Sequence, residues 1–194
     1  MLSVIVIIIA YLLGSVSSAI VVSKLMRLPD PRSSGSGNPG ATNVLRVGGK
    51  RAGVITLLGD VLKGLVPVMI AKALDFSDTA VAITALAAFL GHLYPVYFGF
   101  KGGKGVATGL GILLGLSPVL GGIVLGIWLL ILAVFRYSSL AALTAVVLGL
   151  FYAWGEVPTD YYLVYLVVTI AILWRHRANI IRLIQGTETK VGQR

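Results

Sequence analysis

The chain has 194 residues, of which 57% are hydrophobic and only 12% are charged, and its mean hydropathy is +0.95. It nevertheless carries a formal net charge of +9 at pH 7, and it contains no cysteine. This composition excludes a soluble domain, a disulfide framework, a thiolate nucleophile and a cysteine-based metal site. It predicts an integral membrane protein.

Apolar runs of the length of membrane helices predict an all-α fold with seven transmembrane helices, in a single domain over residues 1–194. The runs cover residues 4–22, 53–73, 80–97, 105–117, 119–135, 138–154 and 160–175. The first run lacks the basic segment that precedes the apolar core of a cleaved signal peptide, so we expect it to be retained as a helix.

The fourth run, 105–117, is short and rich in glycine, so loop charges must decide whether it crosses the membrane. If it crosses, the basic loops share one side, while the acidic residues around 74–79 and 155–159 share the other. If it does not cross, the basic C-terminal segment falls on the acidic side, against the positive-inside rule. We therefore expect seven crossings, the N-terminus outside, and both the loop 98–104 and the C-terminus in the cytoplasm.

Lys24, Lys50, Arg51 and the basic C-terminal tail are expected to set this orientation and to contact anionic lipid head groups. Nucleic acid is not an expected partner, because the basic residues are dispersed over short loops and do not form one soluble basic face.

The first unusual cytoplasmic segment is GSGNPGATNVLR, residues 35–46. Asn38 followed by Pro39 predicts a helix N-cap with proline at the first helical position, and the preceding glycines let backbone N–H groups converge. A helix N-terminus beside Ser36, Asn38 and Arg46 is typical of a phosphate site. The alternative is a plain flexible turn, which does not require these arginine and asparagine residues.

Asp60 and Lys63 lie three residues apart inside the second apolar run. An ionisable side chain inside a membrane span costs free energy and usually faces the protein interior. There, opposite charges one helical turn apart can pair. We favour a structural pair that supports the site over a catalytic role for Asp60.

The second segment is GHLYPVYFGFKGGKGVATG, residues 91–109. Lys101 and Lys104 alternate with Gly102, Gly103 and Gly105, so bare backbone and two ammonium groups can approach one anion. The segment is not a Walker loop, since Phe98 and Gly105 stand where that motif requires glycine and serine or threonine. Alone, this lysine-glycine loop is a weak indication of a site.

The third segment is RHRANIIRLIQGTE, residues 175–188, which we expect to continue the last span as a helix. On such a helix His176 and Asn179 are one turn apart, and Arg175, Asn179 and Arg182 form a polar stripe. The alternative for His176 is an ordinary residue at the membrane border.

Taken together, these three segments resemble the three cytoplasmic motifs of the bacterial membrane glycerol-3-phosphate acyltransferases that use acyl-phosphate as donor. The resemblance covers essentially the whole chain, including its length, its seven spans and the order of the motifs. The chain departs from the common pattern at Pro31, where many relatives have leucine, and at Ala178, where glutamate is common. Neither departure falls on a residue to which we assign chemistry.

The resemblance implies transfer of a fatty acyl group from acyl-phosphate to the sn-1 hydroxyl of glycerol-3-phosphate, which yields lysophosphatidic acid and phosphate. It places the enzyme in the bacterial cytoplasmic membrane, with its active site on the cytoplasmic face, and suggests functional coupling to an acyl-phosphate-producing enzyme. The implied catalytic residues are Ser36, Arg46, His176 and Asn179. The implied substrate-binding residues are Ser36, Asn38, Arg46, Lys101, Gly102, Gly103, Lys104, Gly105, His176 and Asn179. No metal or cofactor is expected.

Without cysteine, and with no base identifiable by spacing near Ser36, we favour direct attack by the glycerol hydroxyl over an acyl-enzyme. The proton acceptor is either His176 or the phosphate of the donor, and the sequence does not choose between them. It also leaves open which motif holds which phosphate. A multi-pass organic-phosphate transporter is the alternative function, but the chain lacks the internal repeats that such transporters tend to show.

Overall fold

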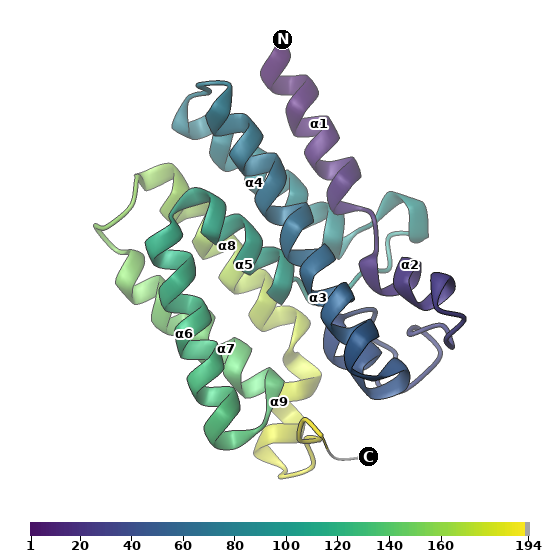
Figure 1. The fold of residues 1–194 in the computed structure, drawn as a ribbon. Helices are drawn as coiled ribbons and strands as arrows, with labels where there is room; N and C mark the ends of the chain where they lie inside the picture. Colours follow the sequence, from purple (N-terminus) through teal and green to yellow (C-terminus); the bar gives the residue numbers. More distant parts are fainter. Residues whose placement is uncertain (193–194) are drawn as a thin grey trace.

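The computed structural model describes residues 1–192, which form α-helices and one short 3-10 helix with no strand among them. The all-α class expected from the sequence is therefore confirmed. The elements are α1 (Leu2–Gly14), α2 (Ser18–Leu25), α3 (Ala41–Ala73), α4 (Asp78–Leu93), η1 (Val96–Phe98), α5 (Val106–Leu116), α6 (Pro118–Phe135), α7 (Ser138–Ala153), α8 (Thr159–Arg175) and α9 (Arg177–Ile184). The start of α1 and the last helix, α9, lie at opposite ends of the helical bundle (Figure 1).

Three segments in the described part of the chain, α3, Asp78–Phe98 and α6, are long and apolar enough to cross a membrane. The number rises to five if α1 with α2, and α8 with α9, each count as one bent span. The apolar helices α5 and α7 have only 11 and 16 residues. At about 1.5 Å per residue each is shorter than the roughly 30 Å hydrocarbon layer. Length and composition therefore support three to five of the expected spans.

Two of the expected spans are interrupted or extended in the structure. The run 4–22 breaks between α1 and α2, whose axes differ by 48°, and the Ser17 hydroxyl accepts a hydrogen bond from the Ile20 N–H to cap α2. Helix α3 begins well before the run 53–73 and has a kink at Gly49, where φ is +80°. Glycine adopts this left-handed conformation without the steric cost that a side chain would add.

The expected continuous polar stripe after the last span is wrong. The chain breaks at His176, and α9 turns by 58° from α8, so Arg175 lies on a different helix from Asn179 and Arg182. The backbone N–H of His176 still bonds to the carbonyl oxygens of Ile172 and Leu173, which tightens the last turn before the bend.

Small residues allow the helices that carry the motifs to pack closely. A Cβ at Gly64 of α3 would meet the Thr108 carbonyl of α5, and one at Gly111 would meet the Val61 carbonyl in return. Close backbone approach through glycine is a common way to join membrane helices. It fixes α5, and the loop that precedes it, against α3.

Candidate active site

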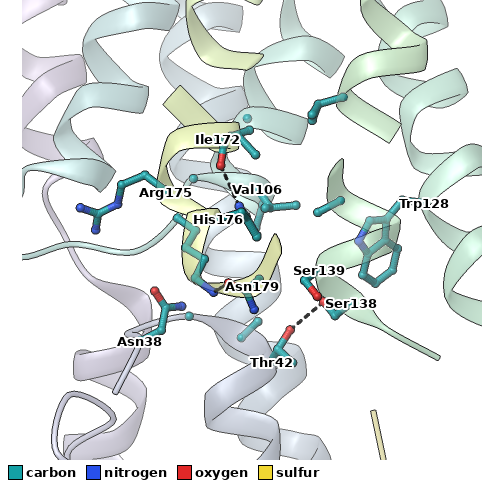
Figure 2. Close-up of a pocket in the computed structure, with 18 of the residues that line it drawn as sticks. Asn38, Thr42, Val106, Trp128, Ser138, Ser139, Ile172, Arg175, His176 and Asn179 are labelled. Atoms are coloured by element: carbon teal, nitrogen blue, oxygen red, sulfur yellow. Dashed lines mark hydrogen bonds between the residues drawn. The ribbon is translucent and has the colours of Figure 1, made fainter. Parts of the chain in front are cut away.

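A cavity of about 570 Å³ lies among α3, α4, α5, α6, α7, α8 and α9. In Figure 2, Arg175, His176 and Asn179 project from the last two helices, and Trp128 of α6 stands across the cavity from Arg175. The lining is polar where the three sequence motifs meet and apolar between α5, α6, α7 and α8. The apolar part is formed by Leu110, Leu113, Val124, Leu125, Trp128, Ala142, Ala145, Val146, Tyr165, Val168 and Ile172.

The first motif forms one wall of the polar part through Ser36, Asn38 and Arg46. The predicted cap at Asn38 is wrong: α3 begins at Ala41, and Gly40 is its N-cap residue in an extended conformation. The N-terminal end of α3 nevertheless faces the cavity, because Gly40, Ala41 and Thr42 all line it. A helix N-terminus in this position favours an anionic ligand.

Asn43, which the sequence analysis did not single out, holds the loop of the first motif in place. Its side chain is 2% exposed, and Nδ2 donates to the carbonyl oxygens of Pro31 and Ser34 at 2.8 and 2.9 Å. Its Oδ1 accepts from the Ser36 N–H at 2.9 Å, so this N–H is not available to a phosphate. Gly35 has a φ of +61°, and a Cβ there would collide with Asn43 Oδ1. The glycine before Ser36 is therefore required both by conformation and by space.

The second motif divides into residues that line the cavity and residues that support it. Lys104 and Gly105 line the cavity, whereas Lys101 is exposed and, with Gly102 and Gly103, lies outside its lining. The Arg175 guanidinium donates to the Gly102 carbonyl at 2.6 Å and to the Gly103 carbonyl at 2.8 Å. These contacts hold the backbone directly before Lys104.

Lys104 joins the second motif to the third, because its ammonium group donates a hydrogen bond to Oδ1 of Asn179. Burial lowers the pKa of Lys104 to about 8. The nearby Glu188 carboxylate opposes this shift, and the surrounding guanidinium groups add to it. An anionic ligand beside Lys104 would restore the preference for the charged ammonium.

In the third motif, His176 and Asn179 are 3% and 5% exposed, and both line the cavity. His176 is therefore buried beside the cavity, which favours a role in the site over an ordinary position at the membrane border. Its Nδ1 lies 2.8 Å from the Ile172 carbonyl oxygen, which can only accept a hydrogen bond (Figure 2). The proton of neutral His176 is therefore on Nδ1, and Nε2 is left as an acceptor.

Glu188, at the end of the third motif, lines the cavity, and the sequence analysis quoted it but did not select it. It accepts hydrogen bonds from Ser139, Asn179 and Arg182, each at 2.7 Å. Burial acts to raise the pKa of Glu188, but these hydrogen bonds outweigh it and keep the pKa below its usual value. Through Asn179, Glu188 is linked to Lys104. The sequence could not predict that Glu188 lies beside Asn179, because a turn between them interrupts the helical spacing.

The C-terminal segment continues from Glu188 across the first motif. The Arg46 guanidinium donates to the Thr189 carbonyl at 3.2 Å, and both residues line the cavity. The Val191 N–H donates to the Arg136 carbonyl at 2.7 Å, which attaches the segment to the turn between α6 and α7.

The expected pairing of Asp60 with Lys63 is confirmed. Lys63 Nζ forms an ion pair with Asp60 Oδ1 at 2.9 Å and donates a hydrogen bond to the Val16 carbonyl at the break between α1 and α2. Asp60 also lines the cavity, with His92 beside it.

Charges around the cavity favour an anionic ligand. The side chains that line it include four cations, Arg46, Lys104, Arg175 and Arg182, against the two carboxylates Asp60 and Glu188. Within residues 1–192 there is no group of three histidine, aspartate or glutamate side chains that could hold a metal ion.

Comparison with known sequences identifies related proteins over nearly the whole chain. The family model described as glycerol-3-phosphate acyltransferase matches residues 4–186. A glycerol-3-phosphate acyltransferase of Thioalkalivibrio sulfidiphilus is 57% identical over 186 residues, which cover 95% of this chain and 92% of the relative. One of Coxiella burnetii is 54% identical over 185 residues, covering 95% of this chain and 96% of the relative.

Two crystal structures have nearly the same fold, and both are of PlsY (YgiH), described as an integral membrane glycerol 3-phosphate acyltransferase. Its glycerol 3-phosphate form has a TM-score of 0.94 and 42% identity, and the match covers 99% of this chain and 96% of that one. Its lysophosphatidic acid form has a TM-score of 0.89 and 40% identity, covering 98% and 95%. By sequence and by fold, this chain belongs to the glycerol-3-phosphate acyltransferase family.

Proposed function

We propose that this protein transfers a fatty acyl group from acyl-phosphate to the sn-1 hydroxyl of glycerol-3-phosphate, which yields lysophosphatidic acid and phosphate. The observation that carries the proposal is the divided lining of the cavity: cations at the polar end suit two phosphates, and the apolar end suits an acyl chain. The similar PlsY structures, in a glycerol 3-phosphate form and a lysophosphatidic acid form, support the same substrate and product here.

Residues of all three motifs bind the two phosphates in this proposal. Ser36 and Asn38, with the N-terminal end of α3, bind one phosphate, and Lys104 with Arg46 binds the other. Asn179 orients glycerol-3-phosphate and holds Lys104 in position. Gly105 is the N-cap residue of α5, and Lys101, Gly102 and Gly103 act through the placement of Lys104, since they lie outside the cavity lining.

The reaction is direct transfer between two anchored substrates. The sn-1 oxygen forms the new ester bond to the acyl carbon, and the bond between that carbon and the phosphate oxygen breaks. In the bound complex Nε2 of His176 accepts a hydrogen bond from the sn-1 hydroxyl and aligns its oxygen for attack. The hydroxyl hydrogen then turns to an oxygen of the departing phosphate, which takes up the proton as the new ester bond forms. The cations near His176 disfavour a charged imidazolium, so the donor phosphate is the better final acceptor. Proximity and fixed positive charge supply most of the acceleration.

In the membrane we propose seven spans, with α5 and α7 crossing as short helices, the N-terminus outside and the C-terminus in the cytoplasm. The distribution of basic residues supports this orientation, and the bacterial relatives support the cytoplasmic membrane as the location. The cavity then opens to the cytoplasm, where an enzyme that produces acyl-phosphate would deliver the donor.

One assay separates this function from transport of an organic phosphate. Purified protein is reconstituted into liposomes and given acyl-phosphate and radiolabelled glycerol-3-phosphate. Label in extracted lipid, dependent on acyl-phosphate, supports the acyltransferase. Water-soluble label inside the vesicles without labelled lipid would establish the transporter instead.

A further inference from the structure

The chain has two histidines, and both line the same cavity. His176 belongs to the third motif and is assigned above. His92, in the last turn of α4, is 7% exposed and has no role in the reaction as described so far.

His92 has a carboxylate on one side of its ring. Its Nδ1 lies 3.7 Å from Oδ1 of Asp60, which is itself 2% exposed and paired with Lys63. This separation is too long for a hydrogen bond, and neither atom has a hydrogen-bond partner within residues 1–192. The negative charge of the carboxylate nevertheless favours the tautomer with the proton on Nδ1. The remaining nitrogen, Nε2, then has an acceptor lone pair.

Within residues 1–192 both ring nitrogens of His92 lack a hydrogen-bond partner, but only Nδ1 is fully buried, and His92 lines the cavity. Gly103 passes directly beside this atom, and a Cβ at position 103 would collide with it. Arg175 fixes the same glycine by binding its carbonyl oxygen. The glycine therefore leaves room at Nε2, and an unpartnered acceptor at the cavity wall gains free energy when a donor reaches it.

The substrates of the proposed reaction supply only two such donors. Ionised acyl-phosphate has no hydroxyl, and the dianionic phosphate of glycerol-3-phosphate is an acceptor only. The donors are the two glycerol hydroxyls, and the cavity presents two imidazole acceptors. Since Nε2 of His176 takes the attacking sn-1 hydroxyl, the 2-hydroxyl remains for His92.

We propose that His92 binds the 2-hydroxyl of glycerol-3-phosphate through Nε2, with Asp60 as the positioning residue that orients its ring. The inference rests on the proposed function. It explains how the site distinguishes two similar hydroxyls: one is held next to the acyl carbon, and the other is held by the wall formed by α3 and α4.

The test uses 3-hydroxypropyl phosphate, which lacks only the 2-hydroxyl, as a competitor in the glycerol-3-phosphate assay. Its competitive constant is measurable whether the enzyme acylates it or only binds it. For His92→Ala we expect the KM for glycerol-3-phosphate to rise about tenfold, the size of one lost hydrogen bond, and the competitor constant to stay within about twofold. His92→Gln, whose amide oxygen is an acceptor, should recover most of the loss.

Two further variants separate binding from structural damage. Asp60→Asn should raise the ratio of the KM for glycerol-3-phosphate to the competitor constant, as His92→Ala does, but by a smaller factor. Thr84→Val, a buried change elsewhere on α4, should leave the ratio at its wild-type value. The inference is overturned if His92→Ala raises both constants equally or changes neither. A wild-type protein that forms no labelled lipid would instead refute the proposed function.

Discussion

The buried ammonium of Lys104 makes the pH dependence of catalysis predictable. With its pKa lowered to about 8, Lys104 loses its charge as the pH rises through 8, whereas an ordinary lysine stays charged to above pH 10. The charged fraction at pH 9 is then about 10%, compared with about 97% for an unshifted lysine. If only the charged form binds a phosphate, kcat/KM falls about tenfold between pH 7 and pH 9.

The assay is a pH profile of kcat/KM for glycerol-3-phosphate, because this parameter reports groups of the free enzyme. The substrate phosphate titrates near pH 6 and so does not distort the alkaline limb. Intact acyl-phosphate must be quantified at each pH. Lys104→Arg should remove the alkaline limb, since arginine stays charged throughout, although its different shape will lower the overall rate. Lys101→Arg, at an exposed position outside the cavity, should keep the wild-type profile.

Two results would refute this reasoning. One is a wild-type profile that stays flat to pH 10, which would mean that Lys104 is not perturbed or does not bind substrate. The other is an alkaline limb with an unchanged midpoint in Lys104→Arg, which would assign the titration to another group.

Three further predictions concern the third motif and the topology. His176→Ala and Asn179→Ala should each lower kcat/KM by about 10- to 100-fold in correctly folded protein. If His176 orients the hydroxyl, His176→Gln should restore much of the lost rate. If His176 takes the proton, His176→Gln should restore none of it. Wild-type kinetics for both alanine variants would show that His176 and Asn179 do not belong to the site. Glu188→Gln exchanges three hydrogen bonds to a carboxylate for weaker neutral ones, so we expect about 2 kcal/mol less stability and a Tm in detergent that is roughly 4–8 °C lower; an unchanged Tm would contradict this. Single cysteines introduced at 155–159 should react with an impermeant thiol reagent on intact cells and those at 98–104 should not, and the reverse pattern would invert the topology.

The helical segments could be predicted because long apolar runs are a strong signal, but the breaks within and beyond them could not. Gly49 is one of many glycines in this chain, and nothing local distinguishes the one that adopts a positive φ inside α3. The bend at His176 depends on contacts of the final turn of α8 and on the docking of α9 against α7, which have no periodic signature. Tertiary packing therefore decided the boundaries, as is usual where two short helices meet.

The motifs indicated which residues meet, but only the fold separates their roles. Lys101 and Lys104 look equivalent in the sequence, yet only Lys104 faces the cavity. Asn43, His92 and Glu188 were missed because each works through a partner far away in the sequence or across a turn, and no spacing rule connects such pairs. The sequence did contain one indication of each of two residues. Asn43 is the second asparagine of the first motif, and Glu188 is the only acidic residue of the third motif.

Arg46 and Thr189 share a hydrogen bond although 143 positions separate them. During translation the first motif is therefore made long before the segment that completes its pocket. A chain that stops after α9 has all its apolar helices for insertion into the bilayer, but Asn179 and Arg182 lack the carboxylate that binds both. Premature termination at that point would thus release an inserted but inactive polypeptide.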